Sequence, residues 1–326
     1  MVSARPVNDR PKQPVLFIMG PTAAGKTDLA VELVRRAPFA IISVDSAMVY
    51  RGLDIGTAKP DAATLATAPH RLIDICDPAD IYSAARFCQD AVTEMQAITA
   101  AGQIPLLVGG TMLYFKALQQ GLSELPEADP ALRIRLAERL ETEGLSALYQ
   151  QLQHVDSEAA IRIHPHDPQR ILRALEVYLL TGRPISDYYR QRKPLLGLFE
   201  PIKIVVSPRE REVLHRRIEL RFGEMLEQGL IDEVQQLKAR PDLSLELPAL
   251  RAVGYRQVWN YLEGMMNYHE MVQRGIITTR QFAKRQLTWL RAERQTDWYD
   301  STIPELASRV IDQLYRQGFF GHREKP

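Results

Sequence analysis

A glycine-rich loop at residues 20–27 limits the architectures open to this chain. The loop reads Gly-Pro-Thr-Ala-Ala-Gly-Lys-Thr, follows the apolar run 15–19 and precedes the helical pattern 28–34. Two glycines separated by four residues and followed by lysine and threonine, between a buried strand and a helix, are typical of a phosphate-binding loop. Backbone N–H groups of such a loop form an anion cradle at a helix N-terminus, where the lysine adds a charge and the threonine hydroxyl a ligand for Mg²⁺. The sequence therefore predicts a ligand with at least a diphosphate, bound by Gly20, Pro21, Thr22, Ala23, Ala24, Gly25, Lys26 and Thr27, the last also holding the metal.

Strand and helix patterns alternate through the N-terminal third of the chain. Short apolar strands are predicted at 40–44, 71–75 and 104–108, and a helix at 84–101. Strands separated by helices pair in parallel, so the expected fold class is α/β, with a P-loop NTPase-like, doubly wound parallel sheet. Ligands bind such sheets at the carboxyl ends of the strands. The phosphate loop, Asp45 and Thr111 all follow strands and are expected to converge there.

A helical insertion domain is predicted over residues 117–199. Its first part, 122–160, carries a net charge of −5. Helical patterns cover 131–140 and 170–180, and the second follows the helix-start signal Asp167-Pro168.

The remaining residues, 1–116 and 200–326, are expected to form the α/β core with a C-terminal helical region. A fifth apolar strand at 202–206 returns the chain to the sheet. After it, Ser207-Pro208 predicts the start of a helix that carries Arg217 and Arg221 on one face.

Composition and charge are those of an ordinary globular protein. The chain has 326 residues and a net charge of +1, which shows no global preference for polyanions. Cys76 and Cys88 have no neighbouring ligand cluster, so neither a disulfide framework nor a zinc site is predicted. No apolar stretch approaches the roughly 20 residues that span a bilayer, and the polar segment 5–12 lacks the apolar core of a signal peptide. We therefore expect a cytoplasmic protein without membrane contact.

Two segments are locally basic. Residues 168–193 carry a net charge of +4, and residues 250–294 carry +5 with several aromatic residues interleaved. Phosphate contact combined with aromatic stacking is how proteins hold unpaired bases. Amphipathic helices with solvated arginines and core aromatics have the same composition, so both interpretations stay open at this point.

Several ordered motifs between residues 14 and 300 together resemble one family. Besides the phosphate loop, they are DSAMVY at 45–50, DIGTAKP at 54–60, GGTMLY at 109–114, DPQRILRALE at 167–176 and AVGYRQ at 252–257. The chain resembles the tRNA dimethylallyltransferases, the bacterial tRNA isopentenyltransferases that modify the adenosine 3′-adjacent to the anticodon.

This resemblance implies a prenyl transfer. The loop would hold the diphosphate of dimethylallyl diphosphate, and the allyl carbon would move to the exocyclic amine of adenine while pyrophosphate leaves. Asp45 would orient the amine and accept its proton, Thr111 would contact the reacting centre, and Arg221 with Mg²⁺ would stabilise the departing charge. The tRNA contacts implied by the resemblance are Asp45, Ser46, Ala47, Met48, Thr111, Arg133, Gln169, Arg170, Ile171, Leu172, Arg173, Leu250, Arg251, Ala252, Val253, Gly254, Tyr255, Ala283, Lys284, Arg285, Gln286, Leu287, Thr288, Trp289 and Leu290. A monomer is expected.

Alternatives remain for both the residues and the reaction. Asp45 is also suited to binding Mg²⁺ or to capping a helix, and the Thr111 hydroxyl to capping a helix that begins at Met112. A small-molecule kinase using ATP would have the same loop, sheet and helical lid. A non-catalytic RNA-binding protein would have the basic C-terminal region but no use for Asp45 and Thr111 at the mouth of the crevice.

Overall fold

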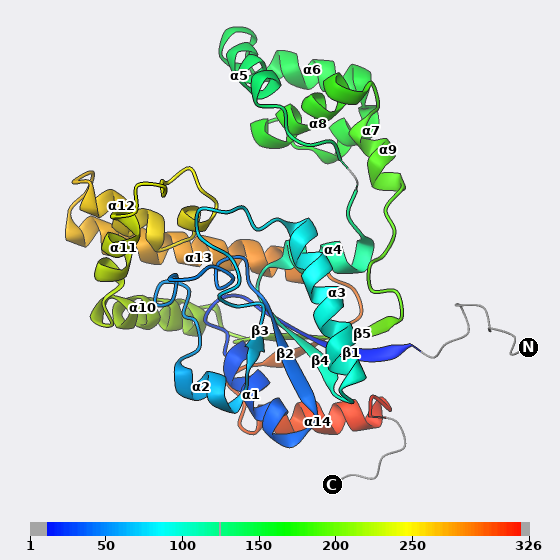
Figure 1. Ribbon diagram of the computed structural model, residues 1–326, viewed down its shortest axis with the longest axis vertical. Helices are drawn as coiled ribbons and strands as arrows, with labels where there is room; N and C mark the ends of the chain where they lie inside the picture. The colour runs from blue at the N-terminus through cyan, green and yellow to red at the C-terminus, as the bar shows by residue number, and fades with distance from the viewer. Residues whose placement is uncertain (1–11, 124, 321–326) are drawn as a thin grey trace, which may run out of the picture. The chain divides into compact units, whose positions relative to one another are not determined.

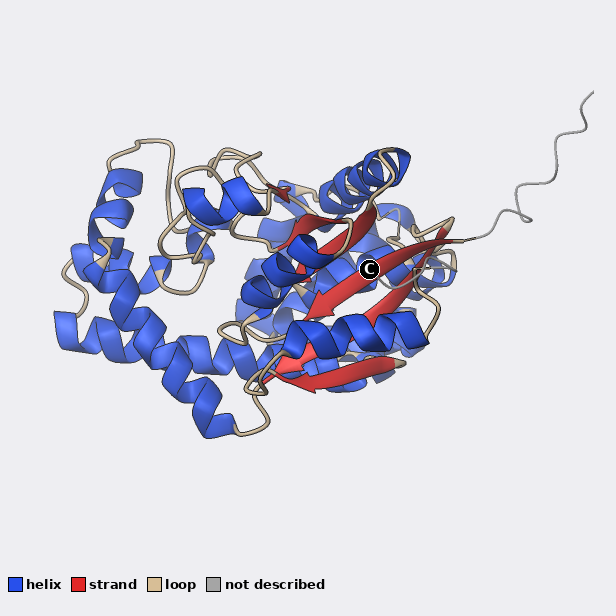
Figure 2. Cartoon of the chain, turned by 90° about the horizontal axis from the view of Figure 1, so that it is seen from below, coloured by secondary structure: helices blue, strands red, loops and turns tan. Residues whose placement is uncertain are grey.

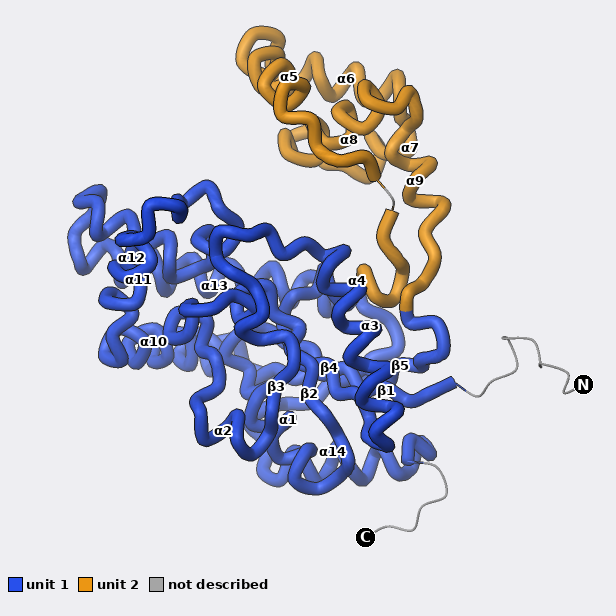
Figure 3. The backbone as a smooth tube through the Cα atoms, viewed as in Figure 1, with its two compact units in different colours: residues 1–116, 196–326 blue, residues 117–195 orange. Residues whose placement is uncertain are grey.

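The computed structural model describes residues 12–123 and 125–320, which form two compact units. The first unit comprises residues 1–116 and 196–326, and the second comprises residues 117–195 (Figure 3). Residues 1–11, which contain most of the polar N-terminal segment, lie outside the described residues, as does Glu124. Within the described residues, no helix is both long and apolar enough to cross a membrane.

A six-stranded sheet organises the first unit, with the order β3-β2-β4-β1-β5-β6 (Figure 1). All neighbouring strands pair in parallel, and β1 at the centre has Ile18 opposite Val108 of β4 and Ile204 of β5. The strands are β1 Gln13–Met19, β2 Phe39–Val44, β3 His70–Arg71, β4 Ile104–Gly109, β5 Phe199–Ser207 and β6 Thr296–Asp300.

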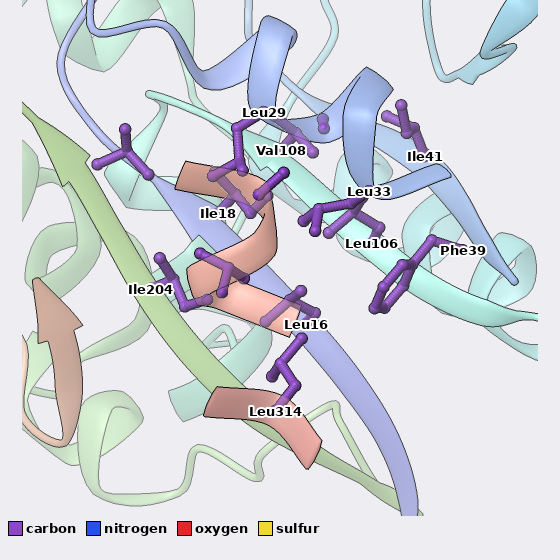
Figure 4. Packing of buried hydrophobic residues seen from close by; sticks show 14 of the residues in the cluster. Leu16, Ile18, Leu29, Leu33, Phe39, Ile41, Leu106, Val108, Ile204 and Leu314 are labelled. Atoms are coloured by element: carbon purple, nitrogen blue, oxygen red, sulfur yellow. The ribbon is translucent and has the colours of Figure 1, made fainter. Parts of the chain in front are cut away.

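One face of the sheet is covered by α1 (Lys26–Arg36) and α14 (Leu306–Arg316). Alternate residues of the parallel strands, such as Leu16 and Ile18 of β1, point into this cluster together with Leu33 of α1 (Figure 4). All three side chains are fully buried. Because strands in a parallel sheet are covered on both faces, their sequences read as continuous apolar runs.

The opposite face is covered by α3 (Ala84–Ala100) and α4 (Met112–Gln120). Phe17 of β1 and Phe115 of α4 have ring centroids 5.1 Å apart, and Phe87 of α3 stacks on Tyr114 of α4 at 4.2 Å. Figure 2 shows helices on both sides of the twisted sheet. The predicted α/β class with a doubly wound parallel sheet is therefore confirmed.

The predicted strand at 71–75 is wrong beyond its first residue. Leu72 and Asp74 have φ angles of 64° and 57°, which take the backbone out of the extended conformation, so β3 ends at Arg71. The backbone N–H groups of Asp74 and Ile75 instead bond to the carbonyls of Met48 and Val49. The apolar residues of this segment therefore lie in a turn that is hydrogen-bonded to residues 48 and 49, and not in a strand.

The region after β4 differs from the prediction in two further places. Ser207 does not cap a helix, because it is the last residue of β5 and its carbonyl accepts a hydrogen bond from Ser301. The helix begins four residues after Ser207, at Arg211. The edge strand β6, which pairs with β5, was not predicted because its sequence Thr-Asp-Trp-Tyr-Asp has no apolar run.

Helices complete the first unit beyond the sheet. They are α2 Ala62–Thr67, α10 Arg211–Glu227, α11 Leu230–Lys238, the 3₁₀ turn η2 Ala249–Arg251, α12 Tyr255–Leu262 and α13 Tyr268–Ala292. Helices α10 and α13 pack closely, since a methyl group on Gly275 would lie 2.2 Å from the ring of Phe222. Helix α13 is capped by Asn267, whose side chain accepts from the N–H of Glu270 while that glutamate bonds back to Asn267.

The second unit is a small helical bundle with its own apolar core. Leu136, Leu148, Leu152 and Leu175 are among its buried side chains. As the motif predicts, Asp167 caps α8, accepting the N–H of Arg170, with Pro168 in the first turn. The helices are α5 Pro130–Glu143, α6 Leu145–Val155, α7 Ser157–Arg162, α8 Pro168–Thr181 and α9 Ile185–Arg190.

Candidate active site

The phosphate loop joins β1 to α1, and each of its two glycines is required for a different reason. Gly25 has φ 85°, a conformation that favours glycine, and it stands directly before α1. Gly20 has no room for a side chain, because a methyl group there would lie 2.3 Å from the carbonyl oxygen of Val206 on β5. The loop is thus turned by one glycine and pressed against the neighbouring strand by the other, with its N–H groups at the N-terminus of α1.

A cavity of about 740 Å³, here called the phosphate cavity, opens over this loop. Side chains and backbone come from the loops after β1, β2, β4 and β6 and from α10 and α13. Its lining includes Thr22, Ala23, Ala24, Gly25, Lys26, Thr27, Asp45, Met48, Thr57, Gly110, Arg217, Arg221, Phe282, Gln286 and Ser301. The structure therefore brings the predicted loop, Asp45 and Arg221 to one place at the carboxyl ends of the strands.

Two half-buried cations, Lys26 and Arg221, line the phosphate cavity. Burial, together with the charge of Arg221, lowers the pKa of Lys26 to about 8, against an opposing effect from Asp45. Burial also lowers the pKa of Arg221 from its ordinary value. Lys26 donates to the carbonyl of Pro21 at 2.7 Å, and Arg221 lies 3.5 Å from the Thr22 hydroxyl. Cations held in this way favour a ligand that brings negative charge.

Asp45 follows β2 and Thr111 follows β4, and both side chains bind backbone N–H groups of the turn at residues 46–48. Asp45 Oδ1 accepts hydrogen bonds from the N–H groups of Ala47 and Met48, at 2.8 and 3.2 Å. Thr111 Oγ1 accepts from the N–H of Ser46 at 3.1 Å. One carboxylate oxygen of Asp45 thus fixes the turn, whereas Oδ2 has no hydrogen bond among the described residues and is available to a substrate.

A second cavity, of about 320 Å³, shares a wall with the phosphate cavity. The shared wall contains six residues that line both spaces: Thr22, Ala23, Asp45, Thr57, Arg221 and Phe282. Further lining comes from Ser46, Ala47, Thr111, Arg251, Ala252, Val253, Gly254 and Arg285. Two ligands bound in the two spaces would therefore meet at Asp45 and Arg221.

The loop that carries Thr57 is held in place by the C-terminal helices. Glu233 of α11 accepts the backbone N–H groups of Asp54, Ile55 and Gly56 and also the hydroxyl of Tyr255, the last at 2.6 Å. Burial and the neighbouring Glu233 raise the pKa of Tyr255, which stays protonated as the donor. The motifs at 54–60 and 252–257 are thus packed together.

The oxygen groups at the phosphate loop fit a hard cation. The Thr27 hydroxyl and the Asp45 carboxylate both line the phosphate cavity. Mg²⁺ binds proteins through one or two such groups and takes its other ligands from substrate phosphates and water. Clusters of three or more His, Cys, Asp or Glu suited to a metal do not occur among the described residues.

The predicted tRNA contacts on α13 divide by burial. Lys284, Arg285, Thr288 and Trp289 are exposed, and Lys116 lies over the Trp289 ring at 5.3 Å. Ala283, Gln286 and Leu290 are buried. In the segment 250–255, Leu250 and Tyr255 are likewise buried, whereas Arg251 is exposed and pairs with Glu246 at 2.7 Å.

In the second unit, two of the predicted contacts, Arg133 and Arg173, pair with a buried carboxylate. Glu176, 2% exposed, accepts from Arg133 at 2.9 Å and from Arg173 at 2.6 Å. These hydrogen bonds outweigh burial and lower the pKa of Glu176. Gln169 and Arg170 are exposed on the first turn of α8, whereas Ile171 is fully buried.

Arg217, Thr57 and Phe282 are among the side chains of the phosphate cavity that were not predicted as site residues. Arg217, one turn before Arg221 on α10, lines it and donates to Ser301 at 2.9 Å. The spacing of four residues between the two arginines was a usable signal. Thr57 and Phe282 had no such signal, because their approach depends on how the loop and α13 pack.

A model of the family described as IPP transferase matches residues 48–293. The chain belongs to the IPP transferase family. The matched residues include Thr111, Arg221 and the whole of α13. A relative from Alkalilimnicola ehrlichii, named tRNA dimethylallyltransferase, is 62% identical over 305 residues, covering 91% of this chain and 96% of that protein.

Solved structures of IPP transferase relatives have the same fold. The full-length tRNA isopentenylpyrophosphate transferase of Bacillus halodurans is 35% identical with a TM-score of 0.68, covering 96% of this chain and 100% of that one. The tRNA Δ(2)-isopentenylpyrophosphate transferase of Staphylococcus epidermidis is 30% identical, also with a TM-score of 0.68, and covers 94% and 100%. A eukaryotic dimethylallyltransferase acting on tRNA is 25% identical with a TM-score of 0.79, covering 96% and 82%.

Proposed function

We propose that this IPP transferase family member transfers the dimethylallyl group of dimethylallyl diphosphate to the exocyclic amine of the adenosine 3′-adjacent to the anticodon in tRNA, releasing pyrophosphate. Family membership and the name of the relative at 62% identity support prenylation of tRNA. The observation that carries the assignment of the site is that Asp45 stands on the wall common to the phosphate cavity and the second cavity. This arrangement suits a reaction in which a carbon crosses from one ligand to the other.

The phosphate cavity suits the donor. Backbone N–H groups of residues 23–27, with Lys26 and Arg217, suit the diphosphate, and Thr27 is the proposed ligand of Mg²⁺. When bound, Mg²⁺ neutralises charge on the diphosphate and makes pyrophosphate a better leaving group. In this proposal the loop binds the diphosphate of the donor before the transfer and the released pyrophosphate after it.

The second cavity suits the acceptor adenine. A base paired or stacked in RNA is inaccessible to a buried reagent, so the adenosine is expected to be turned out of its stack. Ser46, Ala47 and residues 252–254 present small side chains or backbone there, which permits close approach of a planar base. Its amine would then lie beside Asp45 and Thr111.

The transfer forms one bond and breaks one. The lone pair of the amine attacks the allylic carbon, the bond from that carbon to the bridging oxygen breaks, and both electrons leave with pyrophosphate. The free oxygen of Asp45 is placed to orient the amine and to accept the proton that it loses. Arg221, on the shared wall, is placed to stabilise the charge that grows on the bridging oxygen.

Exposed basic residues suit the RNA backbone. Lys284 and Arg285 on α13, Arg251 of η2 and Arg170 on α8 are proposed phosphate contacts. Arg133 and Arg173, which pair with Glu176, are proposed for the same role. The proposed active form is a monomer. The tRNA substrate supports action in the cytoplasm.

A transfer assay tests the proposal. The protein is incubated with labelled dimethylallyl diphosphate and unmodified tRNA, and in parallel with ATP and the same RNA. Label in the RNA is expected, confined to the adenosine next to the anticodon. The kinase alternative, which family membership disfavours, predicts ADP instead, and a binding protein predicts neither product.

A further inference from the structure

Gln286 of α13 bridges two loops that enclose the phosphate cavity. Its Oε1 accepts the backbone N–H of Thr22 in the phosphate loop at 2.9 Å, and its Nε2 donates to the carbonyl of Gly110 after β4, also at 2.9 Å. The side chain is 5% exposed. We propose that Gln286 is a positioning residue, which sets the phosphate loop against the segment that carries Thr111 and so couples the donor site to α13.

Both hydrogen bonds connect parts of the chain that are remote in sequence. The bond to Thr22 joins residues 264 positions apart, and the bond to Gly110 joins residues 176 positions apart. An amide is the side chain that can accept at one end and donate at the other, and both groups here are backbone groups that need partners when buried. A carboxylate in the same place would leave the Gly110 carbonyl facing an acceptor.

The contact with Gly110 is close, so that a side chain at this position would displace the amide of Gln286. A methyl group at position 110 would lie 2.3 Å from Gln286 Nε2 and 3.2 Å from the carbonyl oxygen of Gly20. The two loops and the amide therefore leave no free space between them. Ala283, one turn earlier on α13, belongs to a small apolar cluster against which Ala23 of the loop packs, so the helix has a second contact with the loop.

Helix α13 therefore has one face toward the donor site and another toward solvent. Gln286 points inward to the donor site, whereas its neighbours Lys284 and Arg285 are exposed and are proposed to contact tRNA. A shift of the helix on binding RNA would be transmitted to the Thr22 N–H and to Gly110, next to Thr111. The family resemblance implies that Gln286 contacts RNA. Because the side chain is buried and bonded to Thr22 and Gly110, we infer instead that it affects the reaction by positioning these two loops.

The inference rests on the proposed function and makes a different prediction from direct RNA contact. We compare Gln286→Met, which keeps the length and removes both hydrogen bonds, with the matched control Lys284→Ala on the exposed face. Three quantities are measured for each: the single-turnover rate with both substrates saturating, the Kd of dimethylallyl diphosphate, and the salt dependence of the tRNA Kd.

For Gln286→Met, we expect the rate to fall at least tenfold and donor binding to weaken, while the Kd and salt dependence of tRNA stay unchanged. For Lys284→Ala, we expect tRNA to bind more weakly and with a smaller salt dependence, while the Kd of dimethylallyl diphosphate stays unchanged, because Lys284 is a proposed phosphate contact. A normal rate in Gln286→Met, or a loss confined to tRNA binding, overturns the proposal. Failure of the wild-type protein to transfer any label refutes the proposed function instead.

A double-mutant cycle separates positioning from general destabilisation. Gly110→Ala displaces the amide without removing it and is expected to reproduce the loss of rate. Gln286→Ala vacates the space that the new methyl group needs, so the double variant should be no slower than the slower single variant, measured where thermal melts show all proteins folded. Independent, additive losses of rate would show that the bridge does not act as a unit.

Discussion

Protonation of Lys26 should control binding of the donor between pH 7 and pH 10. Burial and the charge of Arg221 lower the pKa of Lys26 to about 8, so the cradle loses a positive charge in an accessible pH range. Diphosphate favours the protonated lysine and therefore binds with uptake of a proton above that pH. With this pKa, the protonated fraction falls about tenfold from pH 7 to pH 9, which corresponds to about 1.4 kcal/mol of binding free energy.

Calorimetry with dimethylallyl diphosphate and Mg²⁺, without tRNA, measures this effect directly. Titrations at several pH values in buffers of different ionisation enthalpy report both the Kd and the number of protons taken up. The control is Lys26→Met, which should bind more weakly at pH 7 and lose most of the pH dependence. A flat wild-type Kd up to pH 9.5, or the same slope in Lys26→Met, would refute the reasoning.

The lowered pKa of Lys26 also affects the stability of the ligand-free protein, which should rise with pH where donor affinity falls. Between about pH 8 and the ordinary lysine pKa near 10.5, the unfolded chain binds the proton and the folded chain does not. The contribution of Lys26 to the free energy of unfolding therefore rises with pH across that window. Donor binding and apo stability should consequently change in opposite directions in alkaline buffer.

Three further results are expected. Asp45→Asn should bind both substrates yet lose about 10²–10⁴-fold in single-turnover rate, and near wild-type chemistry would exclude it as an essential base. Replacing Lys284 and Arg285 together with alanine should weaken tRNA binding and reduce the magnitude of its log–log salt slope by roughly 1–2, leaving donor affinity unchanged; an unaltered slope would contradict phosphate contact. Gly20→Ala should lower the free energy of unfolding by about 1–3 kcal/mol in urea denaturation, because its methyl group meets the Val206 carbonyl at 2.3 Å, and wild-type stability would show that the strand yields.

The parts of the fold that depend on local patterns could be predicted from the sequence. Runs of apolar residues identified β1, β2, β4 and β5, because strands buried on both faces have a continuous hydrophobic signature. The same rule failed where the backbone turns by positive φ, as at Leu72. It also failed for β6, whose stability comes from pairing with β5 and not from its own composition.

The site was predictable to the extent that topology determines it. Parallel strands end at one edge, so the phosphate loop, Asp45 and Thr111 were expected to approach one another without knowledge of any contact. The contribution of α13 could not be found in this way. Its sequence is amphipathic and basic, which fits an RNA-binding surface, and nothing local distinguishes Gln286, which turns inward, from Lys284, which does not.

Lys26 lines only the phosphate cavity, whereas Arg221 lines both cavities. This difference suggests separate roles for the two cations in the proposed reaction, in which pyrophosphate is the leaving group. Interactions that are equally strong before and during the reaction improve binding only, whereas those that strengthen in the transition state raise kcat. Lys26 lines the phosphate cavity, and its contact with the diphosphate would be present throughout. Arg221 lines both cavities, so in the proposed reaction it would lie where the bridging oxygen gains charge as its bond to the carbon breaks. We therefore assign most of the binding of the donor to the loop and its lysine, and most of the electrostatic acceleration to the arginine on α10.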